Sequence, residues 1–177
     1  MYIRVLDESD AEVYQALRLS ALKNNPEAFG STYEREVEFS VETVAERVKP
    51  LDGKFTLGAF DDREVLVGMV TCMRESGLKT AHKGNVFGMY VSPEARGRGF
   101  GKSLILELIN KARDDGLEQI NLTVVSSNEH AKKLYQSVGF QVYGVERNAL
   151  KYNRQYFDED LMVLFLQDKL GRTLQRQ

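Results

Sequence analysis

The chain has 177 residues, of which 42% are hydrophobic and 28% are charged, which suits one domain with a buried core and argues against wholesale disorder. A formal net charge of -2 disfavours a nucleic-acid binder, and no long apolar stretch suggests a membrane span or a signal peptide. The single cysteine, Cys72, excludes an intramolecular disulfide and favours a cytoplasmic location. The two histidines, His82 and His130, lack zinc-ligand spacing, so we expect no bound metal.

The N-terminal part of the chain is expected to combine two helices with a hairpin. Ser9 and Glu12 have the spacing of a capping box, and Ser40 is a candidate N-cap for a second helix. Asp61 and Asp62 separate two apolar runs, which is a hairpin signal. The predicted elements are a strand over 3–6, a helix over 13–21, a polar segment that contains Phe29, Tyr33 and Glu34, a helix over 41–48, and strands over 55–60 and 65–73.

The C-terminal part alternates strands with helices, and the strand over 85–91, the next helix and the strand over 120–124 form a predicted parallel crossover. The predicted elements are strands over 85–91, 120–124, 140–145 and 161–166, and helices over 101–113 and 128–138. This order predicts an α/β fold in which a mixed sheet is covered by helices on both faces. We expect a single domain over 1–170 and a polar tail over 171–177.

The most informative segment, 96–103, reads RGRGFGKS and leads from a predicted strand into a predicted helix. Its glycines let the backbone approach a ligand and adopt positive φ, while the helix N-terminus presents unpaired N–H groups. With three basic side chains, this predicts an anion site suited to phosphates, the alternative being a turn with solvated arginines. The P-loop pattern fails because Arg96 stands at its first glycine, and G-x-G-x-x-G fails because Lys102 stands at its last.

Residues 96–101 fit a third pattern, [Q/R]-x-x-G-x-[G/A], without a gap. A second block, 128–135, reads NEHAKKLY and is followed by Gly139 and Phe140. In these motifs, their separation and the order of predicted elements, the chain resembles the GNAT superfamily of acyl-CoA-dependent N-acetyltransferases. The resemblance implies a central, mostly antiparallel twisted sheet that is splayed between its fourth and fifth strands.

The resemblance also implies that acetyl-CoA (coenzyme A) lies in the cleft between those strands. Asn128 and the strand that ends at Val91 would hold the pantetheine arm, the glycine-rich turn would hold the pyrophosphate, and Lys132 would lie near the adenosine. The cofactor-binding residues so implied are Met89, Tyr90, Val91, Arg96, Gly97, Arg98, Gly99, Phe100, Gly101, Lys102, Ser103, Asn128, Ala131, Lys132 and Tyr135.

The implied reaction is direct attack of a neutral amine on the acetyl thioester, with a main-chain N–H near Val91 stabilising the oxyanion. Tyr135 would face the thioester sulfur as the acid, the alternative being an aromatic that only packs on the apolar face of its helix. Proton transfer from a phenol of pKa ~10 to a thiolate whose acid has pKa ~8.5 is uphill. The expected role of the hydroxyl is therefore a hydrogen bond that stabilises the leaving sulfur.

The base is less clear, because many relatives carry Glu or His on the fourth strand and residues 85–91 contain neither. Glu34 is the candidate base, the alternative being a solvated acid in the group Glu34, Glu36 and Glu38.

The acceptor is expected to be a primary amine of a small molecule or peptide. Its predicted contacts are Phe29, Tyr33, Glu34 and Tyr156. A non-catalytic acyl-CoA-binding sensor stays open as an alternative because the usual base is missing, whereas Arg96 disfavours a P-loop hydrolase. Many relatives form dimers, so the resemblance leaves both a homodimer and a monomer open.

Overall fold

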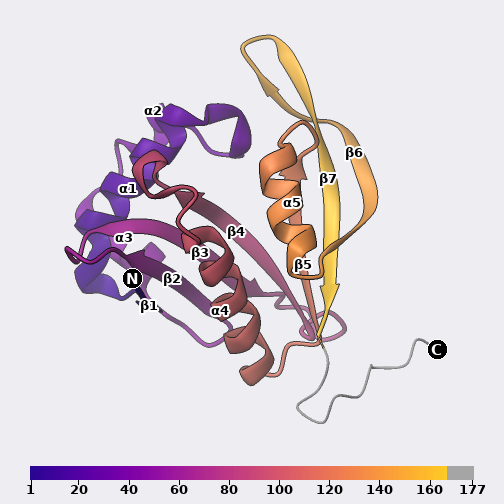
Figure 1. Cartoon of the computed structure of the whole chain (residues 1–177), viewed down its shortest axis with the longest axis horizontal. Helices are drawn as coiled ribbons and strands as arrows, with labels where there is room; N and C mark the ends of the chain where they lie inside the picture. The colour runs from indigo at the N-terminus through magenta and orange to yellow at the C-terminus, as the bar shows by residue number, and fades with distance from the viewer. Residues whose placement is uncertain (167–177) are drawn as a thin grey trace.

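The computed structural model describes residues 1–166, which build a seven-stranded sheet flanked by helices (Figure 1). In chain order the elements are β1 (Tyr2–Val5), η1 (Glu8–Asp10), α1 (Ala11–Asn24), η2 (Pro26–Ala28), α2 (Tyr33–Glu36), α3 (Val41–Val48), β2 (Lys54–Phe60), β3 (Leu66–Arg74), β4 (Lys83–Val91), η3 (Pro93–Ala95), α4 (Phe100–Asp114), β5 (Gln119–Val125), α5 (Glu129–Ser137), β6 (Gln141–Tyr152) and β7 (Gln155–Phe165).

The sheet has the strand order β1-β2-β3-β4-β5-β7-β6, and β4 and β5 are its parallel pair. Their pairing covers only Lys83, Gly84 and Asn85 of β4, opposite residues 119–121 of β5. Beyond Asn85 the two strands diverge, so their facing edges no longer pair with each other. The predicted mixed sheet, its parallel crossover and its splay between the fourth and fifth strands are confirmed.

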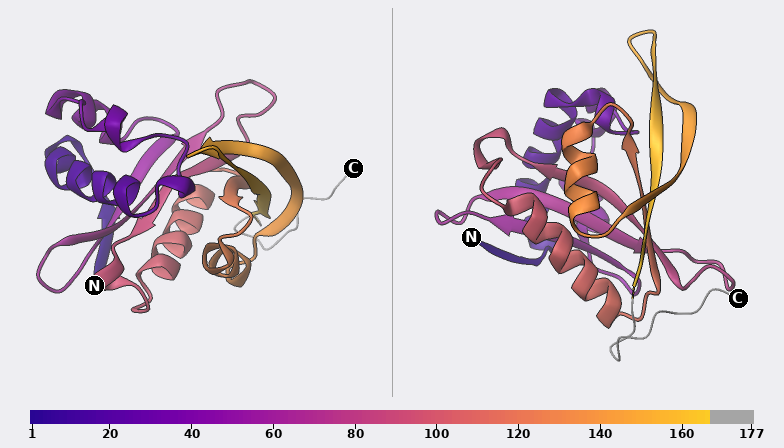
Figure 2. Two further views of the ribbon diagram at one scale, coloured as in Figure 1. Left: turned by 90° about the horizontal axis from the view of Figure 1, so that it is seen from above. Right: turned by 45° about the vertical axis from the view of Figure 1, so that its right-hand side comes forward.

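Helices lie on opposite faces of the sheet (Figure 2), and an apolar cluster fixes them on each face. On one face, Leu104 and Leu108 of α4 and Tyr135 of α5 pack against strand side chains. On the other face, Leu17 of α1 and Val44 of α3 do the same. Of the two splayed strands, β4 contributes to both clusters through Val86 and Tyr90, whereas β5 contributes only to the cluster under α4 and α5.

The first helix begins differently from the prediction. The Asp7 side chain caps η1 by accepting from the Ser9 N–H, and the Asp10 side chain accepts from the Asp7 N–H. The predicted box of Ser9 and Glu12 is therefore wrong, because a 3-10 turn precedes α1 and moves the cap toward the N-terminus. The predicted Ser40 cap is confirmed, since its Oγ accepts from the Thr43 N–H at 3.2 Å.

The last two strands extend well beyond the predicted 140–145 and 161–166. β6 and β7 continue as an exposed hairpin above the rest of the sheet (Figure 1), and their polar ends lack the apolar run on which the prediction depended. The short helix α2 was also not predicted. The predicted tail 171–177 and the predicted domain end at 170 lie outside the described residues. Among residues 1–166, no helix combines the length and apolar character needed to cross a membrane.

Candidate active site

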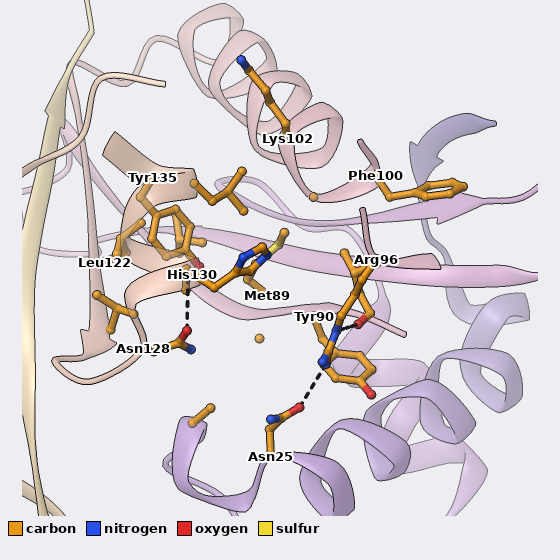
Figure 3. A pocket seen from close by; sticks show the side chains of 18 of the residues that line it. Asn25, Met89, Tyr90, Arg96, Phe100, Lys102, Leu122, Asn128, His130 and Tyr135 are labelled. Carbon is orange, nitrogen blue, oxygen red and sulfur yellow. Dashed lines mark hydrogen bonds between the residues drawn. The ribbon is translucent and has the colours of Figure 1, made fainter. Parts of the chain in front are cut away.

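A cleft of about 660 Å³ opens where β4 and β5 diverge (Figure 3). Its lining comes from the segment after α1 (Asn25, Ala28, Phe29), from β4 (Val86, Phe87, Gly88, Met89, Tyr90, Val91), from the turn into α4 (Ala95, Arg96, Gly97, Gly99, Phe100, Gly101, Lys102), and from β5 and α5 (Leu122, Thr123, Val124, Val125, Asn128, His130, Ala131, Leu134, Tyr135). The cleft therefore brings together both blocks that the sequence singled out.

The turn into α4 lines the cleft and has main-chain N–H groups without helical partners. The Ser103 N–H makes the first helical hydrogen bond, to the Gly99 carbonyl at 3.0 Å, so the N–H groups of residues 100–102 have no acceptor within the helix. Gly97 and Gly99 adopt φ of 74° and 85°, a left-handed conformation that other residues adopt at a cost. Because the helix dipole adds partial positive charge, this turn can bind a phosphate group.

Gly101 has a separate role, which is to let α4 approach its neighbours. A Cβ at this position would lie 3.3 Å from Leu134 Cδ2 of α5 and 3.4 Å from Met89 Cε of β4. A larger residue would push the two walls of the cleft apart at the turn.

Five residues of the second block line the cleft, and two of them, Asn128 and Tyr135, have roles that the structure makes plain (Figure 3). Asn128 caps α5, its Oδ1 accepting from the Ala131 N–H at 3.1 Å, a role that the sequence reading did not foresee. Tyr135 is 6% exposed and packs edge-on against Phe140, with ring centroids 5.9 Å apart. Burial raises the pKa of the Tyr135 hydroxyl above its usual range, so the group is a neutral hydrogen-bond donor.

A β-bulge interrupts β4 at the middle of the cleft. Gly88 and Met89 together oppose Val70 of β3, and Gly88 has a φ of 62°. A bulge leaves one residue outside the regular ladder and turns main-chain groups away from the neighbouring strand. A glycine inside a strand is the signal that could have predicted it. The bulge lies in the same strand as Val91, near which the oxyanion donor is expected. Its main-chain groups are therefore candidates for that donor.

Arg96 connects the turn to the segment after α1 (Figure 3). Its Nε donates to the Val91 carbonyl and its Nη2 to Asn25 Oδ1, both at 3.1 Å, while its guanidinium lies 5.6 Å from the Tyr90 ring centroid. This side chain therefore ties the segment after α1 to the end of β4.

Three of the predicted cofactor residues lie outside the cleft lining. Arg98 stacks over the Phe100 ring at 5.4 Å, and Ser103 lies further along α4. Lys132 Nζ is 3.0 Å from the Asp160 carboxylate, whose hydrogen bond raises the pKa of Lys132. The lysine predicted near the adenosine thus has an acidic partner on β7.

The predicted acceptor residues gather mostly at a second hollow of about 330 Å³ between the segment after α1 and the end of β6. Tyr33 and Glu34 line this hollow, and Phe29 lines both it and the cleft. The two hollows therefore adjoin at Phe29. Tyr156 is 57% exposed and lies outside both linings.

A buried ion network behind the cleft was not predicted. Glu36 is 1% exposed and accepts from Arg18 Nε and Nη2, both at 2.9 Å, while Arg47 Nη1 lies 2.9 Å from its Oε2. Burial alone would raise the pKa of Glu36, but hydrogen bonds from Arg18 and Ser31 and the two guanidinium charges lower it to about 2. Placing Glu36 among solvated acids was wrong, because the unpredicted helix α2 turns it inward.

Glu159 of β7 is a second carboxylate near the cleft. Its strand position is directly opposite Val125 of β5, and the Thr123 hydroxyl is close enough to lower its pKa by hydrogen bonding. Burial, with the neighbouring Glu146 charge, raises the pKa of Glu159. Thr123 and Val125 line the cleft, so this carboxylate lies at its β5 side.

The one cysteine lies in the core. Cys72 is 1% exposed, and burial raises the pKa of its thiol to about 12, so it is no nucleophile at neutral pH. Within residues 1–166, no three His, Cys, Asp or Glu side chains are grouped to hold a metal ion.

Comparisons with known proteins agree with this geometry. A model of the acetyltransferase (GNAT) family matches residues 14–140. Mycothiol acetyltransferase from Segniliparus rotundus is 32% identical over 108 residues, which cover 59% of this chain and 41% of that protein. The chain spans less than half the length of the curated relatives that it matches.

Two solved structures have the same fold along nearly all of their length. An acetyltransferase of the GNAT family from Streptococcus pneumoniae has a TM-score of 0.82 at 25% identity, covering 93% of this chain and 98% of that one. The yncA protein from Salmonella typhimurium, solved with its cofactor acetyl-CoA, has a TM-score of 0.83 at 21% identity and covers 95% of each chain. Since the family model spans both the glycine-rich turn and Tyr135, the chain belongs to the GNAT acetyltransferase family.

Proposed function

We propose that this protein is an N-acetyltransferase that transfers an acetyl group from acetyl-CoA to a primary amine of a small molecule or peptide. The observation that carries the proposal is that one cleft is lined both by a turn with free main-chain N–H groups and by the buried Tyr135 side chain. The residues fit the cofactor: Lys102 and the turn suit a pyrophosphate, and the diverging strand edges suit the amides of a pantetheine arm. The acetyl-CoA bound by yncA supports the same assignment.

The chemistry then follows from the groups around the cleft. Acetyl-CoA supplies an activated acetyl thioester. A main-chain N–H at the Gly88 bulge donates to the carbonyl oxygen as negative charge develops there. The Tyr135 hydroxyl donates a hydrogen bond to the departing sulfur, because its raised pKa makes complete proton transfer unfavourable. Asn128 holds the pantetheine arm.

The attacking amine must lose a proton, and two carboxylates compete for this role. Glu34, the base expected from the sequence, lines the second hollow, and we assign it with Phe29 and Tyr33 to the acceptor. Glu159 borders the cleft wall through Thr123, and its raised pKa makes it the stronger base. We therefore propose Glu159 as the base, active when deprotonated, so turnover falls as the pH drops through its raised pKa.

The test combines a binding assay with an activity assay. Acetyl-CoA and coenzyme A should raise the melting temperature of the wild type, and ATP should not. Release of free thiol should then follow addition of an amine from a panel of amines. Loss of thiol release in Glu159→Gln, with Glu34→Gln retaining it, is expected at saturating amine. Stabilisation without thiol release from any amine would favour the acyl-CoA sensor, and no stabilisation by either coenzyme A species would refute the proposal.

We infer a cytoplasmic location, since a single buried cysteine needs no oxidising compartment. A homodimer remains a proposal from the family resemblance, and the exposed β6–β7 hairpin is the element we would expect to form it. A solution mass from gel filtration with light scattering tests the dimer.

A further inference from the structure

Arg18 of α1 is a buried cation directly behind the cleft. It is 5% exposed, and its guanidinium lies 4.9 Å from the ring centroid of Phe29, which lines the cleft. The Tyr90 ring packs edge-on against the same Phe29, with centroids 6.5 Å apart. The arginine is therefore held in one place by the same aromatic side chain that separates the cleft from the second hollow.

One arm of this guanidinium has no partner. Nε and Nη2 both donate to Glu36, but the buried Nη1 makes no hydrogen bond among residues 1–166. A Cβ built on Gly88 would have Nη1, at 3.8 Å, as its only neighbour within 4 Å. Nη1 therefore lies beside the main chain of the bulge at Gly88, and Gly88 lines the cleft. A buried donor without an acceptor is unfavourable, and a ligand oxygen would satisfy it.

The charge around Nη1 is positive. Glu36 is shared between Arg18 and Arg47, so the three side chains carry a net charge of +1 (two positive, one negative). Arg47 is 37% exposed, and water can screen its charge, whereas Arg18 is buried beside the bulge. The excess charge therefore acts on the cleft through Arg18, where it favours an anion.

The opposite flank of the cleft is acidic. Glu159 and Glu146 are paired across β7 and β6, and the Thr123 hydroxyl bonds to Glu159 from the cleft wall. A ligand that reaches from the bulge on β4 to the β5 side thus meets a cation at one end and carboxylates at the other. This polarity matches a molecule with an anionic group close to its amine.

We propose that the acceptor is an α-amino acid, whose carboxylate binds Arg18 Nη1 beside Gly88 and whose amine lies toward Glu159. The proposal rests on the acetyltransferase function proposed above. It assigns Arg18 to substrate binding and gives a reason for a glycine at the bulge, since a side chain there would block the carboxylate. It also explains why Nη1 of this buried arginine has no hydrogen-bond partner among residues 1–166 while Nε and Nη2 both donate to Glu36.

The test compares each common α-amino acid with its primary amide, using thiol release at saturating acetyl-CoA. The amide keeps the amine and the side chain but lacks the negative charge, and its amine is less basic because no carboxylate stabilises the ammonium form. Intrinsic reactivity at neutral pH therefore favours the amide. The wild type should nevertheless prefer the acid for at least one pair.

Two variants identify the residue responsible. Arg18→Lys keeps a positive charge for Glu36 but lacks the unpaired arm, and should lower kcat/KM for the acid by roughly 10- to 100-fold, the range expected for a hydrogen bond between charged groups, with little change for the amide. Arg47→Gln disturbs the same carboxylate from the other side and should keep the wild-type acid-to-amide ratio. Calorimetric affinity for acetyl-CoA should be unchanged in both variants.

The outcomes separate this proposal from the proposed function. If acetyl-CoA does not bind, or no amine of any kind releases thiol, the acetyltransferase assignment fails and this proposal fails with it. If thiol is released but amides and simple amines are acetylated as well as the acids, only the α-amino acid assignment is overturned. An equal loss of the acid-to-amide ratio in Arg18→Lys and Arg47→Gln also overturns it, because the network would then be structural. The wild-type ratio alone remains decisive if Arg18→Lys does not fold.

Discussion

Removing the Tyr135 hydroxyl tests the chemistry of the cleft while leaving the packing of the ring in place. In Tyr135→Phe the ring keeps its edge-on packing against Phe140, and only the oxygen is lost. A hydrogen bond to a charged sulfur contributes about 1.5–3 kcal/mol, so kcat should fall by roughly 10- to 100-fold. The affinity for acetyl-CoA, measured by calorimetry, should change far less, because the sulfur carries no charge before reaction.

Tyr143→Phe is the matched control, since Tyr143 is an exposed residue of β6 far from the cleft lining. It should keep wild-type turnover and affinity. Unchanged turnover in Tyr135→Phe would remove the hydroxyl from the mechanism. A parallel loss of affinity and turnover would instead assign Tyr135 to binding.

At the residue scale, some site residues could be predicted from the sequence and others could not. Tyr135, Asn128 and the turn glycines lie in short local motifs, so their shared place could be predicted. Arg18 and Glu36 could not, because their pairing depends on how α1 and α2 pack, and a polar stretch offers no periodicity to place Glu36 inward. Glu159 needed the β5–β7 register, which is set by long-range pairing.

At the scale of elements, α4 offers a comparison within one helix. Gly99 precedes its first turn with a φ of 85°, and Gly116 follows its last turn with a φ of 79°; a Cβ at either position would meet no atom within 4 Å. Alanine at either position should therefore carry a similar backbone penalty of about 1–2 kcal/mol, measured by urea unfolding. Only Gly99→Ala should also lower the affinity for coenzyme A, because its Cβ would occupy space beside the N–H groups that hold the pyrophosphate.

Gly116→Ala controls for stability, so the informative quantity is the difference in coenzyme A affinity between the two variants. Equal affinities at equal stability would show that the turn does not contact the phosphates. A larger loss of stability in Gly99→Ala alone would mean that the turn supports the fold rather than the ligand.

The elements themselves were predictable where burial imposes a period. The crossover β4–α4–β5 has apolar strands and an apolar helix face, and its parallel pairing follows from the connection. The ends of β6 and β7 pair with each other but are exposed on both faces. Because neither face is buried, their residues show no apolar alternation. Asp7 caps the turn η1 before α1, two residues before the predicted Ser9, and only the geometry of that turn selects it.

At the scale of the whole molecule, one ion network joins three N-terminal helices and makes the free energy of unfolding depend on pH. Glu36 of α2 is bonded to Arg18 of α1 and Arg47 of α3. Its pKa is lowered from 4.5 to about 2, so its stabilising effect is fully present above about pH 4.5 and is lost as the pH falls toward 2. The free energy of unfolding should therefore decrease across this range as protons bind the unfolded chain first.

Glu36→Gln isolates this contribution. Removing one partner of a buried ion pair leaves an uncompensated buried charge, and the loss at neutral pH should be roughly 3–5 kcal/mol. The difference between wild type and Glu36→Gln, followed by urea unfolding against pH, should shrink as the wild-type carboxylate protonates. Glu38→Gln, at an exposed position on the same segment, should follow the wild-type curve. A Glu36→Gln difference that stays constant from pH 6 to pH 2 would show that the network does not hold the helices through its charge, because such a loss would be one of packing alone.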